Sequence, residues 1–229
     1  MSLGDTRRAL QALAQEVIAC ERCPRLRQYC MQIARDKVRR FRDWEYWGRP
    51  VPGFGDPAAK ILVIGLAPAA HGGNRTGRMF TGDSSGDWLI RALYEQGFAN
   101  QPFSSHRDDG LELRGVYITA IVRCAPPNNR PTREEIENCS PYLLAELEIL
   151  RDVKVVIALG RIAFENYLRR VVRSRAGYAF RHGAAYRLPN GVHLIASYHP
   201  SRQNTQTGRL TWAAWSGIFR LARELASRP

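Results

Sequence analysis

The chain has 229 residues, of which 45% are hydrophobic, so it can bury a substantial core and is expected to form one domain. Its 34 lysines and arginines against 21 aspartates and glutamates give a formal net charge of +13. This excess indicates a polyanion such as nucleic acid rather than a small acidic metabolite, although a charge that serves only solubility stays open. No apolar run approaches the ~18 residues of a membrane span, and charges near the start exclude a signal peptide, so we expect a cytoplasmic protein without membrane attachment.

The first predicted element is an amphipathic helix over residues 5–19, which ends at a closely spaced pair of cysteines. A second pair, spaced far more widely and enclosing three prolines, occurs a hundred residues later. The four cysteines are predicted to form one metal site: Cys20, Cys23, Cys124 and Cys139. The wide second spacing favours an iron-sulfur cluster over zinc, while free thiols or disulfides remain an alternative. Cys30 has no place among four ligands and is expected to be a small buried residue.

The middle of the chain alternates between strand and helix patterns. Residues 35–47 are basic and aromatic and predict a short helix followed by an ordered surface loop, while residues 174–183 predict a mobile basic loop. Short aliphatic runs predict four strands buried on both faces, at residues 61–66, 116–122, 153–159 and 192–197. Helical patterns follow them at residues 84–96, 133–150, 161–172 and 210–226. The fold class is therefore α/β, a three-layer α/β/α arrangement around a central, mainly parallel four-stranded sheet.

Ligands of such sheets bind beyond the carboxyl ends of the strands, where the loops 67–83, 123–131 and 198–209 must meet. The first loop is rich in glycine but lacks the spacing of a phosphate-binding loop, and its length predicts a functional role. Asp83 at its end is equally well explained as the N-cap of the helix that follows, and His71 as a histidine bonded to backbone. His199 follows the last strand at this edge, where it could donate a hydrogen bond to an oxyanion. A purely structural role for this histidine is the alternative.

Together these segments resemble the uracil-DNA glycosylase superfamily, specifically its family 5, the UDGb type. The resemblance covers nearly the whole chain. It rests on the early Cys-x2-Cys, on Gly-Leu-Ala-Pro-Ala-Ala-His-Gly with Phe-Thr-Gly-Asp in the first loop, on Arg-Cys-Ala-Pro-Pro-Asn-Asn-Arg-Pro closing at Cys139, and on Tyr-His-Pro-Ser after the last strand. Each motif alone is weak, but their combination is specific.

The resemblance implies a DNA repair enzyme that flips a deaminated base out of the helix and hydrolyses its glycosidic bond. It also implies a structural 4Fe-4S cluster on the four cysteines, which ties residues 1–58 to the core. His199 is the expected donor to the departing base, with Phe80 stacking on its ring and backbone amides of the loop around it; the pocket residues are Ala67, Pro68, Ala69, Ala70 and Ala120. The polar groups available to orient water are Asp83, Asn74 and His71. The expected DNA contacts are Arg75, Arg78, Ser201, Arg202, Gln203 and Asn204.

Two departures from related families concern the predicted pocket. Ala67 stands where several of them carry a polar residue, and Ala120 stands where many read uracil with an asparagine. Loss of both polar groups predicts a roomier pocket that also accepts hypoxanthine or xanthine. A non-catalytic cluster-bearing DNA-binding protein, or more remotely a cluster-containing oxidoreductase, is the alternative. The expected partner is double-stranded and also single-stranded DNA, bound by a monomer.

Overall fold

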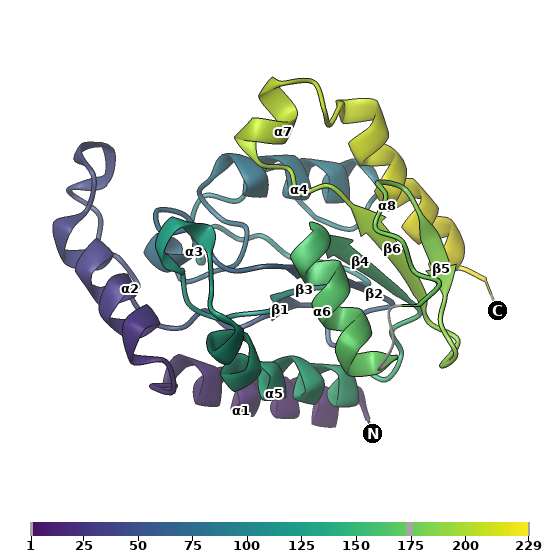
Figure 1. The fold of residues 1–229 in the computed structure, drawn as a ribbon, viewed down its shortest axis with the longest axis horizontal. Helices are drawn as coiled ribbons and strands as arrows, with labels where there is room; N and C mark the ends of the chain where they lie inside the picture. Colours follow the sequence, from purple (N-terminus) through teal and green to yellow (C-terminus); the bar gives the residue numbers. More distant parts are fainter. Residues whose placement is uncertain (1, 173–175, 229) are drawn as a thin grey trace.

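The computed structural model describes residues 2–172 and 176–228, and its centre is a six-stranded sheet with the order β1-β3-β2-β4-β6-β5 (Figure 1). The four inner strands are parallel to one another: β2 Ile61–Gly65, β3 Val116–Ala120, β4 Val155–Leu159 and β6 His193–Ser197. Every residue of β2, β3 and β4 is buried, as their continuous aliphatic sequences predict. The mainly parallel core of four strands is therefore confirmed.

Two short edge strands make the sheet larger than predicted. β1 (Phe54–Gly55) runs antiparallel to β3, and β5 (Ala185–Arg187) runs antiparallel to β6. At two and three residues they are too short to show any periodicity in the sequence. The predicted number of four strands was therefore too small by these two edge strands.

Helices cover both faces of the sheet, which confirms the predicted three layers (Figure 1). Alternate residues of β2 separate the two sides: Ile61 and Val63 pack with α4 (Ser84–Glu95) and α8 (Trp212–Ala226). Leu62 and Ile64 belong to the opposite cluster, formed with α1 (Leu3–Ile18), α5 (Arg133–Ile149) and α6 (Arg161–Val171). This alternation follows from the two-residue period of a strand.

The segments outside this core include one long helix that the sequence patterns did not predict. α2 (Pro24–Asp36) begins with a proline directly after Cys23, and buries only three of its side chains. The basic stretch that follows contains the single 3-10 turn η1 (Arg39–Phe41), in line with the predicted short helix and loop. Of the loop predicted at 174–183, residues 174 and 175 lie outside the described residues.

Short helical turns also occur in the loops at the carboxyl edge of the sheet. The first loop holds α3 (Gly73–Thr76), the second holds η2 (Pro127–Asn129), and the last holds α7 (Arg202–Gln206). The predicted meeting of these loops beyond the strand ends is confirmed, because all three border the same region of the molecule (Figure 1). Among the described residues no helix is both long and apolar enough to cross a bilayer.

Candidate active site and cysteine cavity

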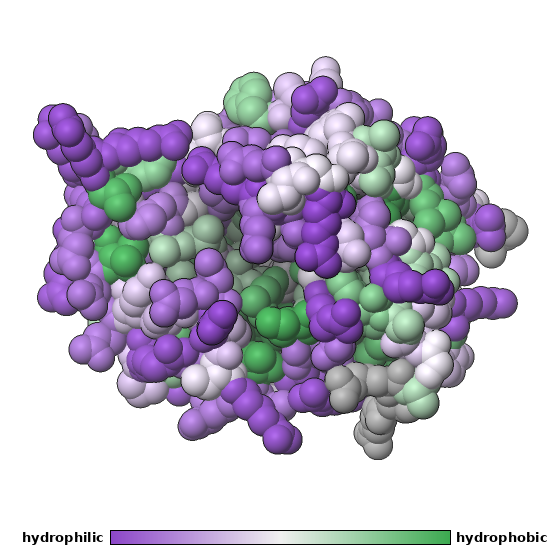
Figure 2. Space-filling model, turned by 45° about the horizontal axis from the view of Figure 1, so that its top comes forward, coloured by the Kyte–Doolittle hydropathy of each residue, from purple (hydrophilic) through white to green (hydrophobic). Residues whose placement is uncertain are grey.

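A cavity of about 580 Å³ opens at the carboxyl ends of β2, β4 and β6. Its walls come from the first loop, the start of α4, the start of α6 and the residues around α7. Figure 2 shows a hollow with hydrophobic residues at its floor and hydrophilic residues around its rim on this face. An apolar floor with few polar groups, at the carboxyl edge of a parallel sheet, is typical of a small-molecule or nucleobase site.

Phe80 and His199 form one side of this cavity. Their ring centroids are 6.0 Å apart and the planes are tilted by 32°. Phe80 has a positive φ of 49°, and its ring lies on Gly65, where an added Cβ would come within 2.8 Å of the ring. The glycine that ends β2 therefore provides the space in which the aromatic ring reaches the cavity.

Burial lowers the pKa of His199 to about 4, so its imidazole is neutral at neutral pH. A neutral imidazole still carries one N–H donor. The amide Nδ2 of Asn204 donates to the carbonyl oxygen of His199 (2.8 Å), and Ser85 Oγ donates to the carbonyl oxygen of Pro200 (3.2 Å). The chain that carries the histidine is thus fixed from both sides.

Asp83 lines the same cavity and caps α4. Its Oδ1 accepts hydrogen bonds from the backbone N–H groups of Ser85 (2.9 Å) and Gly86 (3.0 Å). Its Oδ2 lies against Gly72, where an added Cβ would come within 2.0 Å of it. Burial raises the pKa of Asp83, and the two backbone donors oppose that rise. The N-cap interpretation is confirmed, yet one carboxylate oxygen remains without a hydrogen bond among the described residues.

The other two polar candidates of the first loop do not line the cavity. Asn74 is fully buried, and its Nδ2 donates to the carbonyl oxygens of Cys30 (3.3 Å) and Ala70 (3.4 Å). The Nδ1 of His71 lies 3.1 Å from the hydroxyl of Tyr46, and burial lowers the pKa of this histidine. Of the three groups predicted to orient water, only Asp83 is in place to do so.

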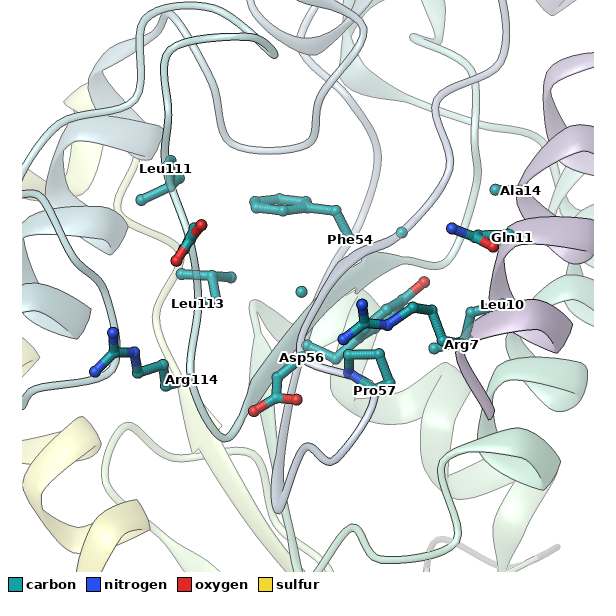
Figure 3. Close-up of a pocket in the computed structure, with 14 residues that line it drawn as sticks. Arg7, Leu10, Gln11, Ala14, Phe54, Asp56, Pro57, Leu111, Leu113 and Arg114 are labelled. Atoms are coloured by element: carbon teal, nitrogen blue, oxygen red, sulfur yellow. The ribbon is translucent and has the colours of Figure 1, made fainter. Parts of the chain in front are cut away.

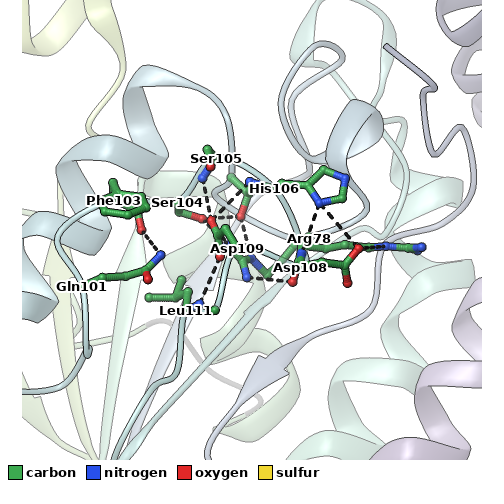
Figure 4. A network of polar contacts seen from close by, with 12 residues as sticks. Arg78, Gln101, Phe103, Ser104, Ser105, His106, Asp108, Asp109 and Leu111 are labelled. Carbon is green, nitrogen blue, oxygen red and sulfur yellow. Dashed lines mark hydrogen bonds and ion pairs between the residues drawn. The ribbon is translucent and has the colours of Figure 1, made fainter.

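Arg78 does not lie where a DNA contact requires it. It is 6% exposed, and its guanidinium forms an ion pair with Asp109 at 2.8 Å. It also donates to Ser104 Oγ (2.9 Å), to Thr81 Oγ1 (3.0 Å) and to the carbonyl oxygen of Arg107 (3.1 Å), within the network of Figure 4. The predicted phosphate contact does not fit these interior bonds, which instead tie the first loop to residues 104–109.

Arg75 is buried too, with 3% of its surface exposed. Its Nε donates to the carbonyl oxygen of His71 (2.8 Å) and its Nη2 to that of Gly82 (2.9 Å). The guanidinium carbon lies over two aromatic rings, 3.8 Å from the centroid of Phe41 and 4.0 Å from that of Trp44. A side chain enclosed in this way is not available to phosphate, so this prediction does not fit either.

Of the four DNA contacts predicted around the last loop, two line the cavity, whereas Gln203 and Asn204 do not. Ser201 and Arg202 line it, and Arg202 and Gln203 are exposed on α7. Ala67 and Ala69 line it from the first loop. The other three predicted pocket residues, however, do not: Pro68, Ala70 and Ala120. Ala120 is buried at the end of β3, beside Gly65 of β2.

Asn129 lines the cavity and was missed by the sequence patterns. It is the last residue of η2, within the proline-rich segment between the second pair of cysteines, and both Asn128 and Asn129 have positive φ values. Asparagine is the residue most tolerant of that conformation after glycine, so a paired Asn-Asn between prolines was the available signal of an ordered turn. The start of α6 also lines the cavity, at residues 160–163.

The four cysteines of the predicted metal site gather around a second, small cavity, although they come from three distant segments. Its other walls include Arg27, Arg123 and Asn138. The backbone N–H of Arg123 donates to Cys139 Sγ (3.3 Å) and Asn138 Nδ2 donates to Cys23 Sγ (3.8 Å). Within the described ranges, no three histidine, cysteine or acidic residues are grouped closely enough to hold a single metal ion.

Cys30 is fully buried outside this cavity, as predicted, and its thiol donates to the carbonyl oxygen of Ala125 (3.5 Å). All five cysteines are free of disulfides. The residues around this cavity therefore fit an anionic iron-sulfur cluster. They supply four thiols, two N–H groups directed at sulfur and two buried arginines.

A third hollow, of about 640 Å³, lies at the edge of the sheet between α1 and β1 (Figure 3). Residues of α1 such as Leu10 and Gln11 face Phe54 and Leu113 across it (Figure 3). None of the predicted site residues lines this hollow. The predicted chemistry is thus concentrated at the carboxyl edge and at the cysteines.

The chain belongs to the uracil-DNA glycosylase superfamily, whose family model matches residues 52–219. Within it the similarity is to the type-5 enzymes, which confirms the resemblance to family 5. The type-5 uracil-DNA glycosylase of Thermus thermophilus is 52% identical over 216 residues, covering 94% of this chain and 98% of the relative. That of Pyrobaculum aerophilum is 50% identical, with coverages of 90% and 88%. The type-4 enzyme of Sulfurisphaera tokodaii is 28% identical over 197 residues.

Proposed function

We propose that this protein is a DNA repair hydrolase that excises uracil from DNA by cleaving the N-glycosidic bond and leaving an abasic site. The observation that carries the proposal is the placement of Asp83, Phe80 and His199 around one cavity at the carboxyl edge of the sheet. Relatives that share about half of their residues with this chain are named type-5 uracil-DNA glycosylases. The net charge of +13 suits a DNA substrate.

The reaction begins with extrusion of the damaged nucleotide, since neither the base edge nor the sugar carbon is accessible inside the duplex. The flipped base then lies in the cavity against the ring of Phe80. The bond between C1′ and the base nitrogen breaks, and its electron pair leaves with the base as an anion. The neutral imidazole of His199 donates its N–H to an oxygen of that anion, which stabilises the charge where it develops.

The sugar left behind has oxocarbenium character and is attacked by water. Asp83 is the group we assign to this step, because its Oδ1 is fixed by two backbone N–H groups while its Oδ2 is available to accept from water. The carboxylate also stabilises the positive sugar through space. The water oxygen bonds to C1′ and loses its proton to Asp83 or to solvent, while the base anion takes a proton from solvent.

We propose a 4Fe-4S cluster on Cys20, Cys23, Cys124 and Cys139. The spacing of the thiols supports it: a zinc ion bonds each sulfur at about 2.3 Å and needs its ligands gathered around one point, whereas a cluster bridges a wider gap. When bound, the cluster supplies a covalent tie between distant segments. It would join residues 1–58 to the core and so complete a single-domain chain.

The finer properties of the substrate belong to the same proposal. Ala67 contributes no polar group to the cavity, whose volume of about 580 Å³ leaves room for bases larger than uracil. We therefore propose that hypoxanthine and xanthine are accepted, in double-stranded and in single-stranded DNA. We also propose that the protein acts as a monomer in the cytoplasm. Its exposed large hydrophobic residues are spread over separate elements, and its thiols are free.

The test is incubation of the purified, iron-loaded protein with a labelled duplex that contains one uracil, followed by alkali, which breaks the strand at abasic sites. A parallel duplex contains hypoxanthine. Strand breakage at uracil is expected, and breakage at hypoxanthine tests the wider specificity separately. Tight DNA binding without any breakage would reject the glycosylase activity and leave a non-catalytic DNA-binding protein.

A further inference from the structure

Residues 37–44, here called the basic arm, form an exposed loop between α2 and the first strand, at the far left of Figure 1. Three arginines of the basic arm are exposed: Arg39, Arg40 and Arg42. Among the described residues, Arg39 and Arg40 take part in no ion pair, and Arg42 meets only its exposed neighbour Asp43 at 3.7 Å. Three exposed cations on one short loop, two of them outside any ion pair, have the composition of a phosphate-binding surface.

The basic arm is held down by a buried cation rather than by apolar packing alone. The guanidinium of Arg75 is enclosed by the rings of Phe41 and Trp44, at 3.8 Å and 4.0 Å from their centroids. Its Nη1 is buried and has no hydrogen-bond partner in the described part of the chain. The polar edge of Arg75 is bonded to the first loop, so one side chain joins the basic arm to the residue before Asp83.

The position of the basic arm relative to the cavity is indicated by the charges that act on the start of α4. Burial raises the pKa of Asp87 in the first turn of α4, and the positive charges of Arg40 and Arg202 oppose that rise. Arg202 lines the cavity from α7. The exposed Arg40 of the basic arm and the exposed Arg202 of α7 therefore both act on one carboxylate in the first turn of α4, and Arg202 itself lines the cavity.

We propose that the basic arm binds the phosphodiester backbone of the DNA strand beside the flipped nucleotide, and that Arg75 is a positioning residue that holds the arm against the first loop through Phe41 and Trp44. This inference rests on the proposed function, since it assigns the phosphate contacts of that same site. It replaces the direct phosphate contacts expected of Arg75 and Arg78 with contacts from a different segment.

The first experiment removes charge from the basic arm in the double variant Arg39→Gln/Arg40→Gln. Binding to a uracil-containing duplex is measured at several salt concentrations for the iron-loaded protein. Each phosphate contact contributes about 0.9 to the slope of log affinity against log salt, so the slope is expected to fall by about 1.8.

The matched control is Arg220→Gln/Arg223→Gln, which removes the same charge from the exposed face of α8. An unchanged slope is expected for this control. A slope that falls equally in both double variants would show a general effect of net charge and would overturn the role of the basic arm. Wild-type protein that neither binds nor cleaves the duplex would reject the proposed function instead, so the two failures are distinguishable.

The second experiment tests the positioning role without changing any charge. Phe41→Ala removes one ring of the enclosure and is expected to weaken DNA binding by about 2- to 30-fold, the range that loss of a cation–π contact covers. Phe41→Trp restores a ring and should restore affinity. Phe103→Ala, an exposed aromatic residue elsewhere, is the control. Wild-type affinity in Phe41→Ala, with iron content unchanged, would contradict the positioning role.

Discussion

The cysteine cavity and the cavity at the carboxyl edge accommodate buried ionisable groups in opposite ways. Beside the cysteines, Arg123 is 1% exposed and its Nη2 donates to the equally buried Glu146 at 2.6 Å, with Thr119 bonded to both. At the carboxyl edge, Asp83 and His199 form no ion pair within the described residues, and burial shifts the pKa of each toward the neutral form. Buried ionisable groups are thus paired beside the cysteines, and they are unpaired at the cavity proposed to bind substrate.

The largest expected effect comes from breaking the buried pair. Glu146→Ala leaves the guanidinium of Arg123 buried without its partner, and should lower the free energy of unfolding by about 3–5 kcal/mol. Urea unfolding of the iron-loaded protein measures this change. Glu95→Ala is the control, because Glu95 pairs with the exposed Arg91 at 3.1 Å on the surface of α4, and its loss should cost below ~1 kcal/mol. Equal costs would mean that burial does not distinguish the two pairs.

At the cavity, removal of an unpaired group should change the rate more than the stability. His199→Ala removes the donor to the departing base and should lower the single-turnover rate of uracil excision by about 10²- to 10³-fold. His193→Ala, at the start of β6, the strand that precedes His199, and away from the cavity, should leave the rate unchanged. A rate within a few-fold of wild type in His199→Ala would remove this histidine from the mechanism.

The shifted pKa of His199 also predicts how stability depends on pH. Its folded pKa of about 4 lies below the value of 6.5 in an unfolded chain, so between these values the unfolded state binds more protons. The contribution of His199 to the free energy of unfolding is therefore fully present above pH 6.5 and is lost as the pH falls toward 4. Urea unfolding from pH 4 to 7 should therefore show a shallower pH dependence in His199→Gln than in wild type. Identical slopes would indicate that the histidine is not desolvated in the folded state.

The same cavity offers a smaller test of the two roles of Asp83. Asp83→Ala removes the N-cap of α4, whereas Asp83→Asn keeps a side-chain oxygen that accepts from the backbone N–H groups of Ser85 and Gly86. The alanine variant should therefore be less stable than the asparagine variant by ~1 kcal/mol. Both should lose excision activity. Equal stabilities would show that the hydrogen bonds to Oδ1 do not stabilise the helix.

The inner sheet was predictable because a strand buried on both faces must be apolar throughout, as in residues 61–66. α2 was not, because its only buried side chains are Leu26, Arg27 and Cys30, too few for a recognisable helical period. The edge strands have too few residues for any pattern.

The candidate site likewise contains residues whose positions the sequence predicted and residues whose positions it did not. Motif residues in the loops after the strands, such as His199 and Asp83, were placed by the topology of a parallel sheet. Arg75 and Arg78 were expected to contact phosphates, and the sequence carries no sign that Asp109 and the rings of the basic arm enclose them. Contacts between segments that are distant in the sequence decided these positions.

The most direct test of the account is the single-turnover rate of uracil excision by wild-type protein and by Asp83→Asn, at equal iron content. The asparagine keeps the cap of α4 but cannot accept a proton or stabilise a positive sugar, so the rate is expected to fall by about 10²- to 10⁴-fold while the free energy of unfolding is maintained. Excision at the wild-type rate by Asp83→Asn would contradict the assignment of this carboxylate, and the absence of excision by wild-type protein would contradict the proposed glycosylase activity itself.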